Sequence, residues 1–297
     1  MPRFIKLILL FAAPILLFFA AGECYVEGLP NPARDKHEWM TAHHDDVTTL
    51  VLGDSHAFYG IRPDQLADSA YSLAMTSQTL RYDDFLLHHY PMPRLRNVVL
   101  SVSYFTLWED FEQIPDHDFE ITRYHIYMDC DIHRSPIYHL ECMHREAFVE
   151  RLKSRYTPQR LSWDSYGWGS NYTVDRKTSP WDNGEARAVA NTYTDSTIVT
   201  YNAGILRQMA NYCRQHNIRL TLVTTPVSKT FRKYESPRQV EVNRRTLSHL
   251  LHDYPEIQQI DLEGDARFGA DDFYDADHLS DVGASRLTNI IRQTIRQ

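Results

Sequence analysis

Two short motifs near opposite ends of the chain carry residue types that act together in acyl transfer. Residues 53–56 (GDSH) place a serine directly after an apolar run, and residues 275–278 (DADH) precede the last helical pattern. A serine hydroxyl is a poor nucleophile until a base removes its proton, and a histidine oriented by a carboxylate supplies that base. We therefore predict Ser55 as the nucleophile, His278 as the base and Asp275 as the residue that orients the imidazole.

Other readings of these motifs remain open from the residues alone. Ser55 could be an ordinary helix cap, because serine and aspartate are favoured there; its pairing with the distant histidine favours catalysis. Asp277 is an alternative orienter, but side chains of neighbouring residues rarely face the same way. Asp54 is expected to brace the loop. His56 either supports the site or contacts the substrate, with an exposed bystander as the alternative.

The elements between the motifs alternate as in a parallel sheet. Short apolar runs without period-two alternation indicate strands buried on both faces, and they cover residues 48–52, 70–74, 97–102, 219–225 and 257–262. Helical spacing marks residues 80–90, 201–216, 239–251 and 281–295. Strand–helix alternation predicts an α/β fold, a flavodoxin-like three-layer α/β/α sandwich with a mostly parallel sheet. Ligands bind beyond the carboxyl ends of such strands, where Ser55 is expected to lie.

One region departs from this rhythm. Residues from about 105 to 200 are rich in tyrosine, tryptophan, histidine and aspartate and have few aliphatic runs. We interpret them as a long insertion over one edge of the sheet. The predicted organisation is therefore a single α/β domain over residues 47–297 that contains this insertion, although the length of 297 residues would also allow two domains.

The N-terminus is predicted to be a targeting segment. Arg3 and Lys6 supply a short positive region, and the 15 residues 7–21 carry no charge. That length lies between the core of a signal peptide and a membrane span of about 20 residues. Residues 1–24 are therefore either a cleaved signal peptide or a retained membrane anchor, and residues 25–46 a lead-in. In both cases the remainder is expected outside the cytoplasm.

Composition excludes several classes of function. Hydrophobic residues make up 43% and charged residues 24%, as in a globular protein, and the formal net charge of −8 leaves no basic footprint for nucleic acid. In an exported protein Cys130 and Cys142 are close enough in sequence to form a disulfide, with free thiols as the alternative. No spacing of cysteine and histidine matches a zinc template. We expect neither a metal nor a cofactor.

The two motifs together resemble those of the SGNH (GDSL-type) hydrolase superfamily. The stretches that carry the resemblance are residues 53–63 (GDSHAFYGIRP) and 275–284 (DADHLSDVGA). The most similar members are membrane-anchored, extracytoplasmic proteins of the DltD-like and alginate-acetylation types. The resemblance covers residues 47–104 and 201–297 and leaves the insertion uncovered.

The resemblance implies a set of oxyanion donors, which this sequence matches only in part. The Ser55 N–H would be one donor. Ser77 stands where the family has a glycine, and its backbone N–H can still donate. Ser103 follows the third strand, where the family has an asparagine; Ser103 or Gln78 would have to replace that donor. Loss of one such donor costs about 10²–10³ in turnover.

These expectations combine into two alternative functions. The first is a serine-dependent carbohydrate esterase or O-acyltransferase of the periplasm or cell surface, anchored in the inner membrane, that passes an acyl group, acetyl above all, through Ser55. Its substrate would be a glycan or acylated polymer, and the resemblance implies a membrane-bound O-acyltransferase as partner. The second is a catalytically weakened glycan-binding or assembly factor that works with such an enzyme. The distance between Ser55 Oγ and a His278 nitrogen separates them, since the enzyme needs about 3 Å.

Overall fold

The chain forms two compact units, which are described separately. The structure is a computed structural model that describes all residues except 1–2, 112, 114–117, 133–138, 155–161 and 296–297. The helical unit contains residues 1–35 and 115–160, and the sheet unit contains residues 36–114 and 161–297. The boundary between them falls within helix α2 (Pro32–His43). The region predicted as one insertion is thus divided between the two units.

A five-stranded parallel sheet forms the centre of the sheet unit. Its strands follow the order β2-β1-β3-β4-β5, and every neighbouring pair is parallel. This is the flavodoxin-like order, in which the crevice for ligands opens beside β1 at the carboxyl edge. The strands lie within two residues of the predicted runs: β1 Thr49–Leu52, β2 Ala70–Ser72, β3 Asn97–Ser101, β4 Arg219–Thr224 and β5 Gln258–Asp261.

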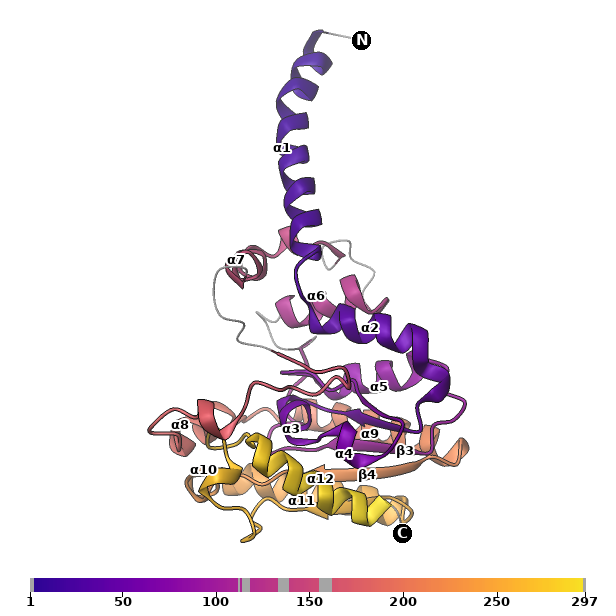
Figure 1. Cartoon of the computed structure of the whole chain (residues 1–297), viewed down its shortest axis with the longest axis vertical. Coiled ribbons are helices and arrows are strands. Elements are labelled where there is room, and N and C mark those ends of the chain that lie inside the picture. Colours follow the sequence, from indigo (N-terminus) through magenta and orange to yellow (C-terminus); the bar gives the residue numbers. More distant parts are fainter. Residues whose placement is uncertain (1–2, 112, 114–117, 133–138, 155–161, 296–297) are drawn as a thin grey trace. The chain divides into compact units, whose positions relative to one another are not determined.

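Helices cover both faces of this sheet, which explains why its central strands are continuous apolar runs. On one face Val51, Val99 and Val223 pack in a single buried cluster with side chains of α3 (Ser55–Gly60) and α12 (Asp281–Ile295). On the other face α9 (Thr197–Gln215) packs on β4 and contacts both α5 and α11. The predicted three-layer α/β fold is confirmed (Figure 1).

The remaining long helices of the sheet unit lie close to where the helical spacing places them, whereas its short helices were not predicted. The long ones are α5 and α11, and the short ones connect strands or lie in the former insertion: α4 Pro63–Leu66, α5 Leu80–His89, α8 Gly184–Ala190, α10 Lys229–Tyr234 and α11 Pro237–Asp253. Single 3₁₀ turns complete the unit at His44–Asp46, Val174–Arg176 and Ala270–Asp272 (η5).

The helical unit is dominated by α1 (Arg3–Glu27), the indigo helix of Figure 1. Among the described residues it is the one helix long and apolar enough to cross a membrane, and none of its apolar window is buried. Among its described residues this unit also contains α6 (Asp118–Tyr127), η3 (Glu141–Met143) and α7 (Arg145–Ser154). The last turn of α1 belongs to the folded unit, because the side chains of Glu23 and Val26 are buried there.

All four cysteines are free thiols. Cys130 is buried and Cys142 is partly buried, and no disulfide joins them. The structure therefore favours the free-thiol alternative for this pair.

Candidate active site

The nucleophile lies on a tight turn between β1 and α3 that only glycine permits. Gly53 has a φ of 123°, a conformation that side chains disfavour, and a Cβ there would lie 2.1 Å from Ser101 Oγ. Asp54 then caps α3 by accepting the backbone N–H of His56 at 2.9 Å. Ser55 is consequently the first residue of α3, at the carboxyl end of β1, where the fold places ligands.

Asp54 is a buried brace for this turn. Its carboxylate accepts hydroxyl hydrogen bonds from Ser101 at 3.3 Å, Ser103 at 2.5 Å and Thr106 at 3.3 Å. These hydroxyls come from the end of β3 and the chain after it, so Asp54 ties the end of β1 to its neighbouring strand. This is the loop-bracing role expected from the sequence.

The base lies on a tight turn between η5 and α12. Asp275 Oδ1 accepts the backbone N–H groups of Asp277 at 3.1 Å and His278 at 2.8 Å, which curls the chain around the carboxylate. Phe273 and Leu279 close the turn as an antiparallel bridge. The three-residue spacing therefore brings the Asp275 carboxylate against the imidazole of the same turn.

The structure brings the three predicted catalytic side chains together. Ser55 Oγ lies 2.8 Å from His278 Nε2, and His278 Nδ1 lies 3.0 Å from each carboxylate oxygen of Asp275. Since Nδ1 faces a carboxylate, it carries the proton, and Nε2 accepts from the serine hydroxyl. The imidazole is buried. This is the arrangement by which a serine hydroxyl is deprotonated for attack on an acyl carbon.

The surroundings of His278 favour its charged form. Burial by itself lowers the pKa of the imidazole, but the carboxylates of Asp275 and Asp277 outweigh it, and the net pKa is raised above the ordinary value. The Arg187 guanidinium opposes this rise. An imidazolium forms when the serine proton is taken up, so these carboxylates stabilise the state that follows attack.

The structure treats the predicted oxyanion donors Ser77, Ser103 and Gln78 differently. Ser77 has a φ of 53°, in the left-handed region that a glycine adopts at least cost. Ser103 must be corrected: its hydroxyl donates to Asp54, and its backbone N–H donates to Thr106 Oγ1 at 2.8 Å, so neither group is free for an oxyanion. Gln78 donates from Nε2 to Asp83 at 2.6 Å and is buried.

Two groups at the site were not assigned from the sequence. Arg187 of α8 donates to both carboxylate oxygens of Asp277, at 2.5 and 2.8 Å. Tyr172 stacks on Tyr59 with ring centroids 3.7 Å apart and stands edge-on to His278 at 5.4 Å. The only signal in the sequence was the aromatic richness of residues 105–200.

The donor set of this site does not fit a metal ion. Single ligand atoms of His56, Asp277 and His278 lie within 4.8 Å of one another. However, both nitrogens of His278 already face Ser55 and Asp275, and Asp277 is held by a guanidinium. A cation at this place would compete with Arg187 for the same carboxylate. The cluster is therefore interpreted as an ion-pair network.

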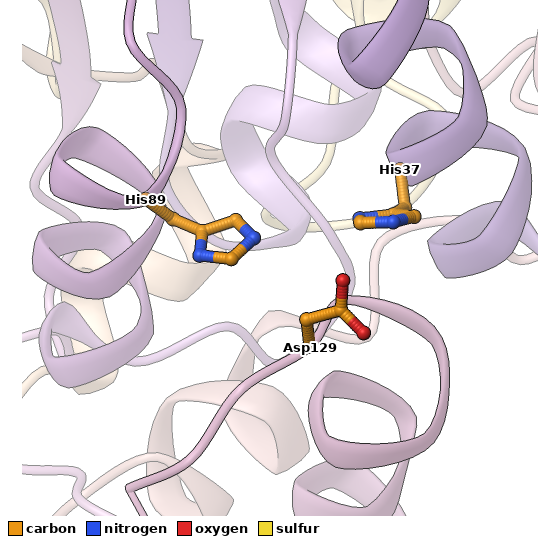
Figure 2. A group of neighbouring side chains, drawn as sticks. All are labelled: His37, His89 and Asp129. Atoms are coloured by element: carbon orange, nitrogen blue, oxygen red, sulfur yellow. The ribbon is translucent and has the colours of Figure 1, made fainter.

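A second group of histidines in the sheet unit involves α2 and α5. His37 Nδ1 lies 3.0 Å from the Tyr90 hydroxyl, and the His37 and His89 rings have centroids 6.3 Å apart. Figure 2 shows these two rings, with Asp129 of the helical unit also labelled. Hydrogen bonding and ring packing account for the pair within the sheet unit, so we assign it no catalytic role.

Comparisons with known proteins yield distant structural similarity only. The chain matches no protein-family model and no curated protein. Similar solved structures include a GDSL-like lipase of Bacteroides thetaiotaomicron VPI-5482 and a protein of Bacteroides fragilis NCTC 9343 described as an acylhydrolase; each is 11% identical, with a TM-score of 0.43, over 90% of this chain and 98% of its own. A protein of Streptococcus pneumonia described as a platelet activating factor has the same identity and TM-score over 96% and 98%. At this distance the similarity carries neither a site nor an activity.

Proposed function

We propose that this chain is a serine-dependent ester hydrolase or O-acyltransferase of the SGNH type. The observation that carries the proposal is the continuous hydrogen-bonded chain from Ser55 through His278 to Asp275. The 2.8 Å separation of Ser55 Oγ and His278 Nε2 is the distance that the enzyme needs and that a binding protein does not. The two sequence motifs that resemble the superfamily supply these same three residues.

In the proposed reaction Ser55 Oγ attacks the carbonyl carbon of an ester while His278 Nε2 takes the hydroxyl proton. The resulting oxyanion accepts the Ser55 N–H. His278 then gives its proton to the leaving alkoxide, which departs and leaves an acyl ester on Ser55. In the second half, His278 removes a proton from water or from an acceptor hydroxyl, which attacks the acyl carbon. The Ser55–acyl bond breaks, and the leaving Ser55 alkoxide takes that proton back from His278. Water gives hydrolysis, and a glycan hydroxyl gives transfer.

For the substrate, we propose an acylated glycan of the cell envelope, with acetyl as the acyl group and a membrane-bound O-acyltransferase as partner. The support is the motif resemblance to the DltD-like and alginate-acetylation types. The alternative of a weakened glycan-binding or assembly factor is supported by one observation: Ser103, which stands where the family has its asparagine donor, has no free donor.

We further propose that α1 is retained as a membrane anchor, with the sheet unit outside the cytoplasm. Supporting this, Glu23 in the last turn of α1 accepts the backbone N–H groups of Glu141 at 2.6 Å and Cys142 at 2.8 Å. Arg151 donates to the carbonyls of Val26 and Pro30 at the same end. These contacts fix the end of α1 within the helical unit, so a retained α1 would continue directly from a folded part of the chain. The intact mass of the membrane-extracted protein tests this: retention predicts residues 1–24 present, and a chain that begins after them contradicts it.

The activity is tested with a chromogenic acetyl ester and the Ser55→Ala variant. We expect turnover by the wild type and its loss in Ser55→Ala at unchanged thermal stability. Ser69→Ala, a change at an exposed serine just before β2, is the matched control and should retain full activity. A folded wild type without turnover, or equal turnover in Ser55→Ala, would contradict the enzyme. An oligosaccharide acceptor separates transfer from hydrolysis: transfer gives an acylated oligosaccharide that mass spectrometry detects, and hydrolysis gives none.

A further inference from the structure

A second buried carboxylate faces the same edge of the catalytic imidazole as Asp275. Asp277 Oδ1 lies 3.6 Å from His278 Nδ1, against 3.0 Å for Asp275. The Asp277 side chain is fully buried, while that of Asp275 is 19% exposed. The imidazole therefore has one carboxylate in hydrogen-bond contact and a second, more deeply buried one just beyond that range.

Arg187 holds this second carboxylate in the ionised form. The guanidinium binds both oxygens of Asp277 side by side, and its Nη2 lies 3.5 Å from His278 Nδ1. Burial raises the pKa of Asp277, but His278, His56 and Arg187 together hold it well below the usual range. Asp277 is therefore negative throughout the range in which an esterase works.

A second imidazole, that of His56, also lies beside Asp277. Its Nε2 lies 3.6 Å from Asp277 Oδ2 and its Nδ1 3.6 Å from Asp54 Oδ1, and its side chain is 1% exposed. Among the described residues, neither ring nitrogen of His56 has a hydrogen-bond partner. The ring also lies 5.0 Å, centroid to centroid, from that of His278. A buried imidazole between two carboxylates is placed for electrostatic contact with both.

We propose that Asp277, clamped by Arg187, is a positioning residue that acts as a second carboxylate for His278 and shares with Asp275 the stabilisation of its imidazolium. This inference rests on the proposed esterase or acyltransferase function and deepens it. Asp275 orients the ring through a direct hydrogen bond, whereas Asp277 supplies charge at fixed distance. With Arg187 counted, the two carboxylates leave one net negative charge beside the ring, which the imidazolium neutralises.

The charges that face His278 come from every element around it. Asp275 and Asp277 lie on its own turn and Arg187 on α8. The rings of His56 and Tyr59 come from α3, and Tyr172 lies just before the 3₁₀ turn Val174–Arg176. Of these, the carboxylates raise the imidazole pKa and Arg187 lowers it. The two members of the Asp277–Arg187 pair must therefore shift the titration of His278 in opposite directions.

The test measures the acid limb of the pH profile of kcat/KM on the chromogenic ester. Activity requires neutral His278, so Asp277→Asn, which removes a negative charge, should move this limb to lower pH by about one unit. It should also lower kcat about tenfold at unchanged KM. Arg187→Gln should move the limb to higher pH. A limb that stays in place in Asp277→Asn, or moves the same way in both variants, overturns the proposal.

Two further measurements test the role of Asp277 even if the ester is a poor substrate or the Asp277→Asn variant does not fold. The imidazole of His278 titrates directly in ¹⁵N-resolved NMR, so the opposite shifts can be recorded even if the chosen ester is a poor substrate; equal shifts there overturn the inference as well. If Asp277→Asn does not fold, Arg187→Gln/Asp277→Asn removes both charges and should return the limb towards its wild-type position. An active wild type with unmoved limbs refutes this inference alone, whereas a wild type without Ser55-dependent turnover refutes the proposed function.

Discussion

Each side of the active site contains a buried carboxylate, and the two carboxylates have different hydrogen-bond partners. On the nucleophile side, Asp54 accepts three hydroxyls and one backbone N–H. On the base side, Asp277 is bound by a guanidinium and lies near two imidazoles. The hydroxyl donors fix Asp54 at the turn, where it adds to the raised pKa of Asp83 but is not among the charges that shift the pKa of His278. A charge-paired carboxylate beside a titrating ring changes the free energy of that ring's protonation. One side of the site is thus a brace and the other an electrostatic device.

The largest effect is expected on the base side. His278→Ala removes the group that takes the Ser55 proton, so kcat/KM on the acetyl ester should fall on the order of 10⁴–10⁶-fold. Stability should change far less, because Asp275 keeps its backbone hydrogen bonds to the turn. Parallel ester assays and thermal unfolding check both parts. A loss below about tenfold would mean that another group serves as the base.

An intermediate effect is expected where the nucleophile turn meets α5. Asp83 accepts the Gly53 N–H at 2.7 Å, and burial raises its pKa to about 8, with the Asp54 carboxylate adding to the rise. A carboxyl whose pKa is raised on folding stabilises the fold fully below its unfolded pKa, near 4, and this contribution is lost as the pH rises to about 8. Wild-type stability should therefore decline across this range by a few kcal/mol.

The matched variant is Asp83→Asn, which keeps an acceptor for the Gly53 N–H but cannot ionise. Urea unfolding from pH 5 to pH 8 should show a decline in the wild type and a flatter profile in the variant. Parallel profiles for the two proteins would contradict protonation of Asp83 in the folded state.

The smallest effect is expected for Asp54→Asn, which tests the brace directly. The amide keeps one oxygen acceptor and loses the other, so stability should fall by about 1–3 kcal/mol. The acid limb of kcat/KM should stay in place, in contrast to the shift expected for Asp277→Asn. Denaturant titration and a pH–rate profile give the two values. A shift of the limb comparable to that of Asp277→Asn would remove the distinction between the two carboxylates.

The sheet and the three catalytic side chains follow from local patterns in the sequence. Strands buried on both faces leave continuous apolar runs, and the Asp275–His278 spacing suits a tight turn, so both were predictable. The position of Asp277 was not, because Asp275 accepts two successive N–H groups and thereby curls the turn until Asp277 also reaches the ring. Neighbouring side chains here approach the same imidazole, against the general expectation.

Arg187 and Ser103 depend on long-range contacts that no spacing in the sequence records. Arg187 reaches Asp277 across 90 residues from a seven-residue helix in the irregular segment, where hydrophobic periodicity gives no register. Ser103 follows β3 as predicted, but its hydroxyl donates to Asp54 in the turn after the neighbouring strand β1. A motif therefore predicts after which strand a residue lies. Which hydrogen bonds its side chain forms depends on how the strands pair, and the motif does not predict that.

The most direct test of the central claim is covalent labelling with a fluorophosphonate probe, followed by mass spectrometry of the proteolytic peptides. The triad predicts one phosphonate adduct on Ser55 in the wild type. It also predicts no adduct in Ser55→Ala and strongly slowed labelling in His278→Ala, since an unassisted hydroxyl is a poor nucleophile. A folded wild type that stays unlabelled, or one that labels equally fast without His278, would contradict Ser55 as an activated nucleophile.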